Sequence, residues 1–203
     1  VADHGGIDIS VANAGRIRLT SPLDPWTKAL ADFDDQIGTN LKGVYLLGRA
    51  VAPVMVARGG GHIVNISTDH GHRAPGVRTG GGPRMDVYDA SMWGIRGLTE
   101  AWAEALRPHC IRVNELCMGA TDGEMLREFV GDRATPELIA TWLRPGDLGR
   151  VLVDLVAEGP EGRTGTQIGL WVGHPVQLPR VDPVGQADSA VAESTRSSSL
   201  APR

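Results

Sequence analysis

The stretch "HIVNIST", residues 62–68, is a short run rich in β-branched apolar side chains and predicts a buried strand. Before it, residues 41–61 carry apolar side chains at helical spacing and end in three glycines, which stop a helix. After it, residues 88–107 predict a second helix with one apolar face. Because a strand between long helices is the unit of a parallel sheet, this stretch predicts an α/β fold.

The same alternation continues toward both ends of the chain. We expect further strands at 7–15, 110–119 and 165–173, further helices at 21–40 and 146–159, and loops at 69–87 and 120–143, the second loop with one short helix. This order predicts a doubly wound parallel sheet with helices on both faces. Ligands of such sheets bind beyond the carboxyl ends of the strands, where Asn13, Thr68 and Met118 are expected, and Tyr88 begins the helix that leads away.

Composition indicates one ordinary globular domain. The chain has 203 residues, of which 41% are hydrophobic and 22% charged, with a net charge of −4. This charge provides no reason to expect nucleic acid or an anionic membrane as a partner. No apolar run approaches the roughly 20 residues that cross a bilayer. The two cysteines, Cys110 and Cys117, form no disulfide framework, so we expect a cytoplasmic protein.

The two ends of the chain differ from its middle. The sequence runs from Val1 almost at once into strand-like text, as though an earlier part were missing. Residues 180–203 are rich in Pro, Ser, Ala and Gly and predict a disordered tail. We therefore expect one domain over residues 1–179, lacking its first βαβ portion and exposing the edge of the strand at 7–12.

Six short motifs occur in the order typical of one large enzyme family. They are "VANAG" (11–15), "TNLKGVY" (39–45), "GHIVNIST" (61–68), "YDASM" (88–92), "IRVNELCMG" (111–119) and "TGTQIGLWVG" (164–173). Over about residues 5–173 the chain resembles the short-chain dehydrogenases/reductases. The resemblance implies a Rossmann-like fold and hydride transfer between NAD or NADP and a small-molecule alcohol or ketone. It also implies a homo-oligomer, a dimer or a tetramer, paired through the helices at 40–57 and 88–107.

The resemblance assigns roles to individual residues. Tyr88 is expected to be the general acid/base, Thr68 to hold the substrate oxygen, and Asn40 to hold a water of the proton path. The expected cofactor-binding residues are Asn13, Ala14, Gly15, Tyr88, Met118, Gly119 and Thr121.

The chain departs from the family pattern at two places that concern chemistry. Met92 stands where the family has a lysine one helical turn after the tyrosine, and a thioether carries no charge. The glycine-rich turn that binds the cofactor pyrophosphate does not precede the strand at 7–15. Two interpretations therefore stay open: an NAD(P)-dependent oxidoreductase of doubtful activity, and a catalytically inactive relic or binding scaffold.

Two further side-chain groups have competing interpretations. Asp69, His70 and His72 lie close together in sequence, and a metal-dependent hydrolase is a remote alternative, because these ligands share one loop and have no distant fourth. Trp93 and Trp102 on the helix at 88–107 are expected to serve packing or a subunit interface rather than the substrate.

Overall fold

The computed structural model describes residues 4–71 and 84–170. Its single sheet has the order β1-β2-β3-β4, and every neighbouring pair of strands is parallel. The strands are β1 (Ile9–Ala12), β2 (Gly61–Thr68), β3 (Ile111–Met118) and β4 (Gln167–Leu170). The predicted α/β fold with a parallel sheet is confirmed.

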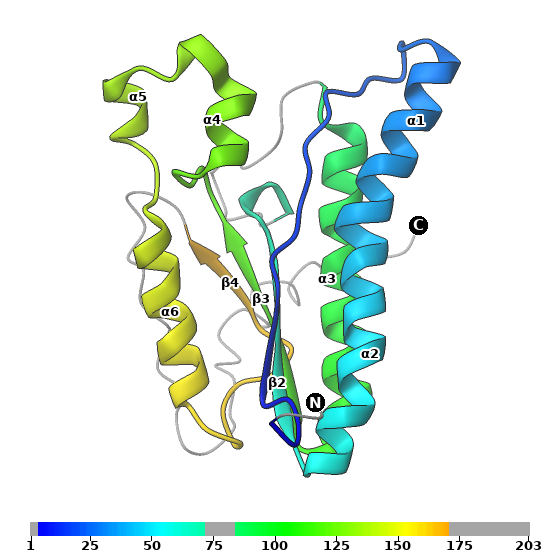
Figure 1. The fold of residues 1–203 in the computed structure, drawn as a ribbon, viewed down its shortest axis with the longest axis vertical. Helices are drawn as coiled ribbons and strands as arrows, with labels where there is room; N and C mark the ends of the chain where they lie inside the picture. The colour runs from blue at the N-terminus through cyan, green and yellow to red at the C-terminus, as the bar shows by residue number, and fades with distance from the viewer. Residues whose placement is uncertain (1–3, 72–83, 171–203) are drawn as a thin grey trace, which may run out of the picture.

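Helices cover both faces of this sheet. They are α1 (Trp26–Gln36), α2 (Gly43–Arg58), α3 (Asp86–Leu106), α4 (Glu124–Val130), α5 (Pro136–Ile139) and α6 (Pro145–Ala157). Figure 1 shows α2 and α3 side by side along one face and α6 along the other. The short helices α4 and α5 lie beyond the carboxyl end of β3. The arrangement is Rossmann-like and doubly wound, as the sequence predicts.

The central position of β2 in the sheet explains why its sequence is apolar without alternation. Successive side chains of a strand point to opposite faces of the sheet. Ile63 packs with Val51 and Met55 of α2, whereas Val64 packs with the apolar side of α6 around Leu155. Both faces of β2 are thus covered by helices, and both sets of positions need apolar side chains.

The prediction that one helix ends at residue 40 and another begins at residue 41 is wrong. Instead of separate helices at 21–40 and 41–61, one helical run extends from Trp26 to Arg58 through a π-helical turn, Ile37–Lys42. No glycine pair or proline interrupts the chain at the expected boundary, so the backbone hydrogen bonding continues. The run ends where the glycines predict, at Gly59 with a left-handed φ of 90°.

The sequence predicts one short helix in the segment 120–143, and the structure contains two. After α4 and a 3₁₀ turn, Thr135 caps a second helix by accepting a hydrogen bond from the Leu138 N–H at 3.3 Å. Pro136 takes the first position of that helix, where its missing N–H costs nothing. A capping residue followed by proline is a local signal that starts α5.

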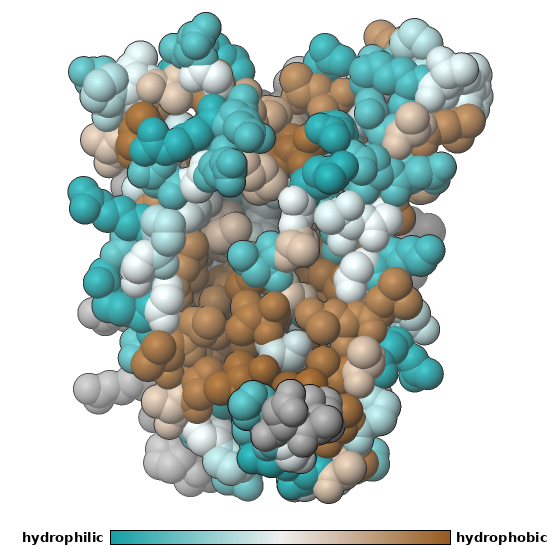
Figure 2. All heavy atoms as spheres, in the orientation of Figure 1, coloured by the Kyte–Doolittle hydropathy of each residue, from teal (hydrophilic) through white to brown (hydrophobic). Residues whose placement is uncertain are grey.

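One edge of the sheet exposes apolar surface. Within the described residues, β1 pairs only with β2, and its Ile9 and Val11 are 44% and 38% exposed. A groove beside it is lined by Val11, Asn13, Ile66, Leu116, Met118, Pro145, Leu148, Gly149 and Leu152. Figure 2 shows apolar side chains gathered on this face of the molecule. The expectation that the strand at 7–12 exposes an edge is confirmed for the described part of the chain.

Some sequence predictions fall outside the described residues. They include most of the loop at 69–87, the predicted tail at 180–203 and the domain boundary at residue 179. Over residues 4–71 and 84–170, no helix is both long enough and apolar enough to cross a membrane.

Candidate active site

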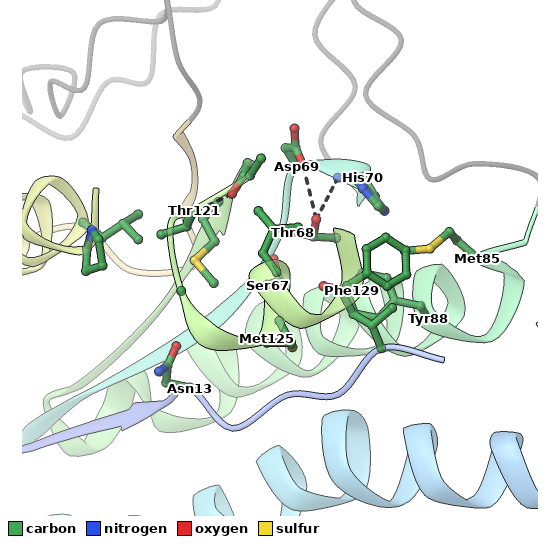
Figure 3. A pocket seen from close by; sticks show the side chains of 18 residues that line it. Asn13, Ser67, Thr68, Asp69, His70, Met85, Tyr88, Thr121, Met125 and Phe129 are labelled. Carbon is green, nitrogen blue, oxygen red and sulfur yellow. Dashed lines mark hydrogen bonds between the residues drawn. The ribbon is translucent and has the colours of Figure 1, made fainter. Parts of the chain in front are cut away.

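A cavity of about 360 Å³ lies at the carboxyl ends of the parallel strands. Its lining includes Asn13 after β1, Thr68 at the end of β2, Tyr88 in the first turn of α3 and Met118 at the end of β3. Figure 3 shows the labelled side chains Asn13, Thr68 and Tyr88 around this space. The structure thus brings together the four segments that the sequence predicts to converge.

The phenol of Tyr88 is buried at the wall of this cavity. Its side chain is 8% exposed and packs in one cluster with Met85 and Met92. Burial raises the pKa of Tyr88 to about 12, although a hydrogen bond with the Thr68 side chain works against the rise. The carboxylate of Asp89 raises it further. The phenol therefore keeps its proton throughout the neutral range.

Thr68 is the last residue of β2, and its hydroxyl lies within a short chain of polar contacts. It donates a hydrogen bond to Oδ1 of Asp69 at 3.2 Å and accepts one from the His70 N–H at 3.4 Å (Figure 3). The strand end and the 3₁₀ turn Asp69–Gly71 therefore hold the hydroxyl at the cavity.

His70 and Asp89 form a pair that the sequence did not predict. The His70 Nδ1 lies 2.8 Å from Oδ1 of Asp89, and the imidazole meets the Tyr88 ring edge-on with centroids 5.7 Å apart. The sequence offers only a partial signal: because Thr68 and Tyr88 are expected to converge, residues 70 and 89 are expected near each other, but their contact depends on the tertiary structure. The arrangement can position an imidazole N–H or lone pair at the cavity.

The structure adds no support for a metal site within the described residues. The described residues contain no group of three or more His, Cys, Asp or Glu side chains placed to hold a metal ion. His72, one of the three side chains that suggested a metal, lies outside those residues.

Met92 is buried one turn after Tyr88 and is 6% exposed. No lysine or arginine is among the described residues that line the cavity. Of the arginines in the predicted loop at 69–87, Arg84 contacts Asp24 at 3.5 Å, and Arg73 and Arg78 lie outside the described residues. Within the described part of the chain, the residue one turn after the phenol is therefore an uncharged, buried side chain.

Asn40 lies close to the site but does not line the cavity. Its side chain accepts a hydrogen bond from the Arg16 N–H at 2.7 Å and donates to the Arg16 carbonyl at 3.0 Å. It also donates to Ser91 Oγ at 3.1 Å, and Ser91 in turn donates to the Tyr88 carbonyl at 2.7 Å. Asn40 thus joins the segment after β1 to the first turns of α3. Its predicted role in holding a water stays a prediction.

The expected cofactor-binding residues divide into two groups. Asn13, Tyr88, Met118, Gly119 and Thr121 line the cavity. Ala14 and Gly15 are exposed and are not part of its lining.

A family model described as short chain dehydrogenase matches residues 1–134. The chain belongs to the short-chain dehydrogenase family. It is 33% identical over 149 residues to gluconate 5-dehydrogenase of Gluconobacter oxydans, covering 73% of this chain and 54% of that protein. It is 30% identical over 174 residues to the 3-oxoacyl-[acyl-carrier-protein] reductase FabG of Thermotoga maritima, covering 84% and 67%.

Solved structures agree with this family fold. The structure titled "ElxO with NADP Bound" has a TM-score of 0.68 and 23% identity, and the match covers 83% of this chain and 67% of that one. At this identity the likeness concerns the fold alone. The chain spans about half to two thirds of the length of the curated relatives named above.

The lining of this cavity is compatible with one end of the nicotinamide cofactor that the family resemblance implies. Gly119 and Ala120 follow β3 at the cavity and present little side-chain bulk, which leaves room for a flat ring against the strand ends. Asn13 and Thr121 add an amide and a hydroxyl. These residues concern the nicotinamide end of such a cofactor.

Proposed function

We propose that this chain is an NAD(P)-dependent oxidoreductase of the short-chain type that acts on a small alcohol or ketone. The observation that carries the proposal is the convergence of the Tyr88 and Thr68 side chains at one cavity beyond the strand ends. The fit at Asn13, Gly119 and Thr121 supports a nicotinamide cofactor, either NAD or NADP. A cytoplasmic location and a homo-oligomeric state are parts of the same proposal.

The protonated phenol favours carbonyl reduction over alcohol oxidation. When bound, the reduced nicotinamide supplies the hydride that the carbonyl carbon accepts. When the substrate binds, Thr68 turns its one hydroxyl proton from Asp69 to the substrate oxygen, and Tyr88 transfers its proton to that oxygen as the new C–H bond forms. Because the pKa of Tyr88 is about 12, the acid form required for reduction is abundant at pH 7, and the phenolate required for oxidation is rare.

The test measures oxidation of NADH and NADPH with small ketones. Tyr88→Phe should abolish turnover, and the matched control Tyr45→Phe, which changes the exposed tyrosine of α2, should retain it. Thr68→Ser should keep most activity because it keeps the hydroxyl, whereas Thr68→Val should lose about 100-fold. Equal activity of the two Tyr variants would contradict the assignment.

A non-catalytic scaffold is the second candidate, and the buried Met92 favours it, since no cation adjoins the phenol among the described residues. Titration of NADH and NADPH followed by fluorescence separates the candidates. Saturable cofactor binding together with turnover supports the oxidoreductase, whereas cofactor binding without turnover of any alcohol or ketone supports the scaffold.

A further inference from the structure

One side of the cavity is apolar and comes mainly from α4. Met125, Leu126 and Phe129 project from this helix into the lining, at positions i, i+1 and i+4. Met85, just before α3, completes the wall. Figure 3 shows Met85, Met125 and Phe129 around the same space as Thr68 and Tyr88.

This apolar wall lies next to the place between Thr68 and Tyr88 where the substrate oxygen is proposed to bind. Phe129 packs against the buried cluster that contains Met85 and Tyr88. A substrate whose oxygen lies between Thr68 and Tyr88 must therefore place its carbon body against Phe129 and Met85. The body of the substrate contacts aromatic and thioether groups, which favour apolar surface and offer no strong hydrogen bond.

The charged residues of the cavity lining also favour an uncharged substrate body. The described lining contains one carboxylate, that of Asp69, and no lysine or arginine. A carboxylate on the substrate would lose its hydration here and meet no lysine or arginine from these residues, which is costly in a low-dielectric site. The imidazole of His70, which also lines the cavity, is already paired with the carboxylate of Asp89. An uncharged body loses nothing by the same transfer.

We propose that the cavity takes an uncharged ketone, or the matching alcohol, with a compact apolar body, and discriminates against a carboxylate-bearing substrate. The inference rests on the proposed function for its chemistry and on the α4 wall for its specificity. The volume of about 360 Å³ must also hold the nicotinamide ring, and it lies at the lower end of the range of ligand pockets, so the substrate body is small.

The test uses two ketones with one ring skeleton, 4-methylcyclohexanone and 4-oxocyclohexanecarboxylate, with the full chain and both NADH and NADPH. We expect kcat/KM to be about 100-fold higher for the methyl compound, because the carboxylate is desolvated without a partner. Phe129→Ala should raise KM for the methyl compound by about 10-fold. The matched control is Phe33→Ala, which removes the half-exposed phenylalanine of α1, outside the cavity, and should leave KM unchanged.

A binding measurement keeps the inference testable where turnover is absent. With ¹³C-methyl methionine, 4-methylcyclohexanol should shift the NMR signals of Met85 and Met125. Met55, fully buried in α2 and absent from the cavity lining, is the internal control and should not shift. Binding of the methyl compound without turnover of either ketone would contradict the proposed function and support the substrate class. Preference for the carboxylate, or the absence of any shift at Met85 and Met125, overturns the substrate class.

Discussion

Met92 lies one helical turn after Tyr88 on α3, and the two side chains share one buried apolar cluster. Residues four apart on a helix lie on the same face, so the side chains of residues 88 and 92 lie on the same face of α3 in adjacent turns. The raised pKa of Tyr88, about 12, results mainly from this burial. A charged side chain at position 92 would therefore be introduced into the apolar cluster that surrounds the phenol.

Met92→Lys should lower the pKa of Tyr88 below about 12, because a nearby ammonium group stabilises the phenolate. The measurement is absorbance at 295 nm against pH in a Tyr45→Phe background, since the chain has two tyrosines. The same variant should lose roughly 3 kcal/mol of stability, because the ammonium replaces a buried thioether. We expect little gain of activity from this change alone.

The matched control for that substitution is Met92→Leu, a volume-conserving change. It should leave the pKa of Tyr88 unchanged and cost less than about 1.5 kcal/mol. An unchanged phenol titration in Met92→Lys would show that the side chain at 92 does not reach the hydroxyl.

Asn40→Ala should lower the free energy of unfolding by about 1–3 kcal/mol, because it removes three hydrogen bonds from a fully buried amide. Urea unfolding measures the loss. The control is Asn13→Ala, where the asparagine is exposed and the change should stay within about 0.5 kcal/mol. If the two variants unfold alike and only turnover falls in Asn40→Ala, the water-holding role predicted from the sequence is favoured instead.

His62 should make the fold sensitive to acid. Burial lowers the pKa of His62 to about 3, with the charge of Arg112 acting in the same direction, and its Nε2 accepts a hydrogen bond from Asn114 at 2.9 Å. Because the folded pKa lies below the ordinary 6.5, this stability is fully present above pH 6.5 and is lost as the pH falls toward 3. Between pH 6.5 and 4.5 the loss should be roughly 2 kcal/mol.

The variant His62→Gln tests this acid sensitivity, because glutamine keeps an acceptor for Asn114 and does not titrate. Urea unfolding at pH 7.5 and pH 4.5 should show a smaller loss than in the unmodified chain. His109→Gln, at an exposed position, is the control and should lose as much stability as the unmodified chain. An acid loss that is the same in all three proteins would exclude His62 as its source.

Alanine substitutions at one glycine of α2 and one glycine of α3 should change the stability of the fold in opposite directions. A Cβ at Gly48 in α2 would overlap with the ring of Trp102, so Gly48→Ala should cost about 1–3 kcal/mol. Gly97 in α3 faces open space, and Gly97→Ala should add about 0.5–1 kcal/mol by its helix propensity. Thermal unfolding of both variants checks the pair, and a loss of stability in both would contradict the assignment of open space at Gly97.

The sequence by itself determined the order of strands and helices and the edge of the sheet where the cavity lies. Those features depend on hydrophobic periodicity and on turn residues, which are signals within short segments of the sequence. The apolar run of β2 and the glycine stop after α2 are examples, and both occur as predicted. The local signals also placed Thr68 and Tyr88 at one cavity, because parallel strands end on the same side.

Only the tertiary structure decided what those side chains touch. Asn40 bonds Arg16 across 24 residues and Ser91 across 51, and His70 pairs with Asp89 across 19. Phe129 of α4 likewise packs against the buried cluster that contains Tyr88, because α4 follows the carboxyl end of β3 at the cavity. Hydrogen bonds and packing between distant segments depend on the relative placement of whole elements, and no local pattern of residues encodes that placement.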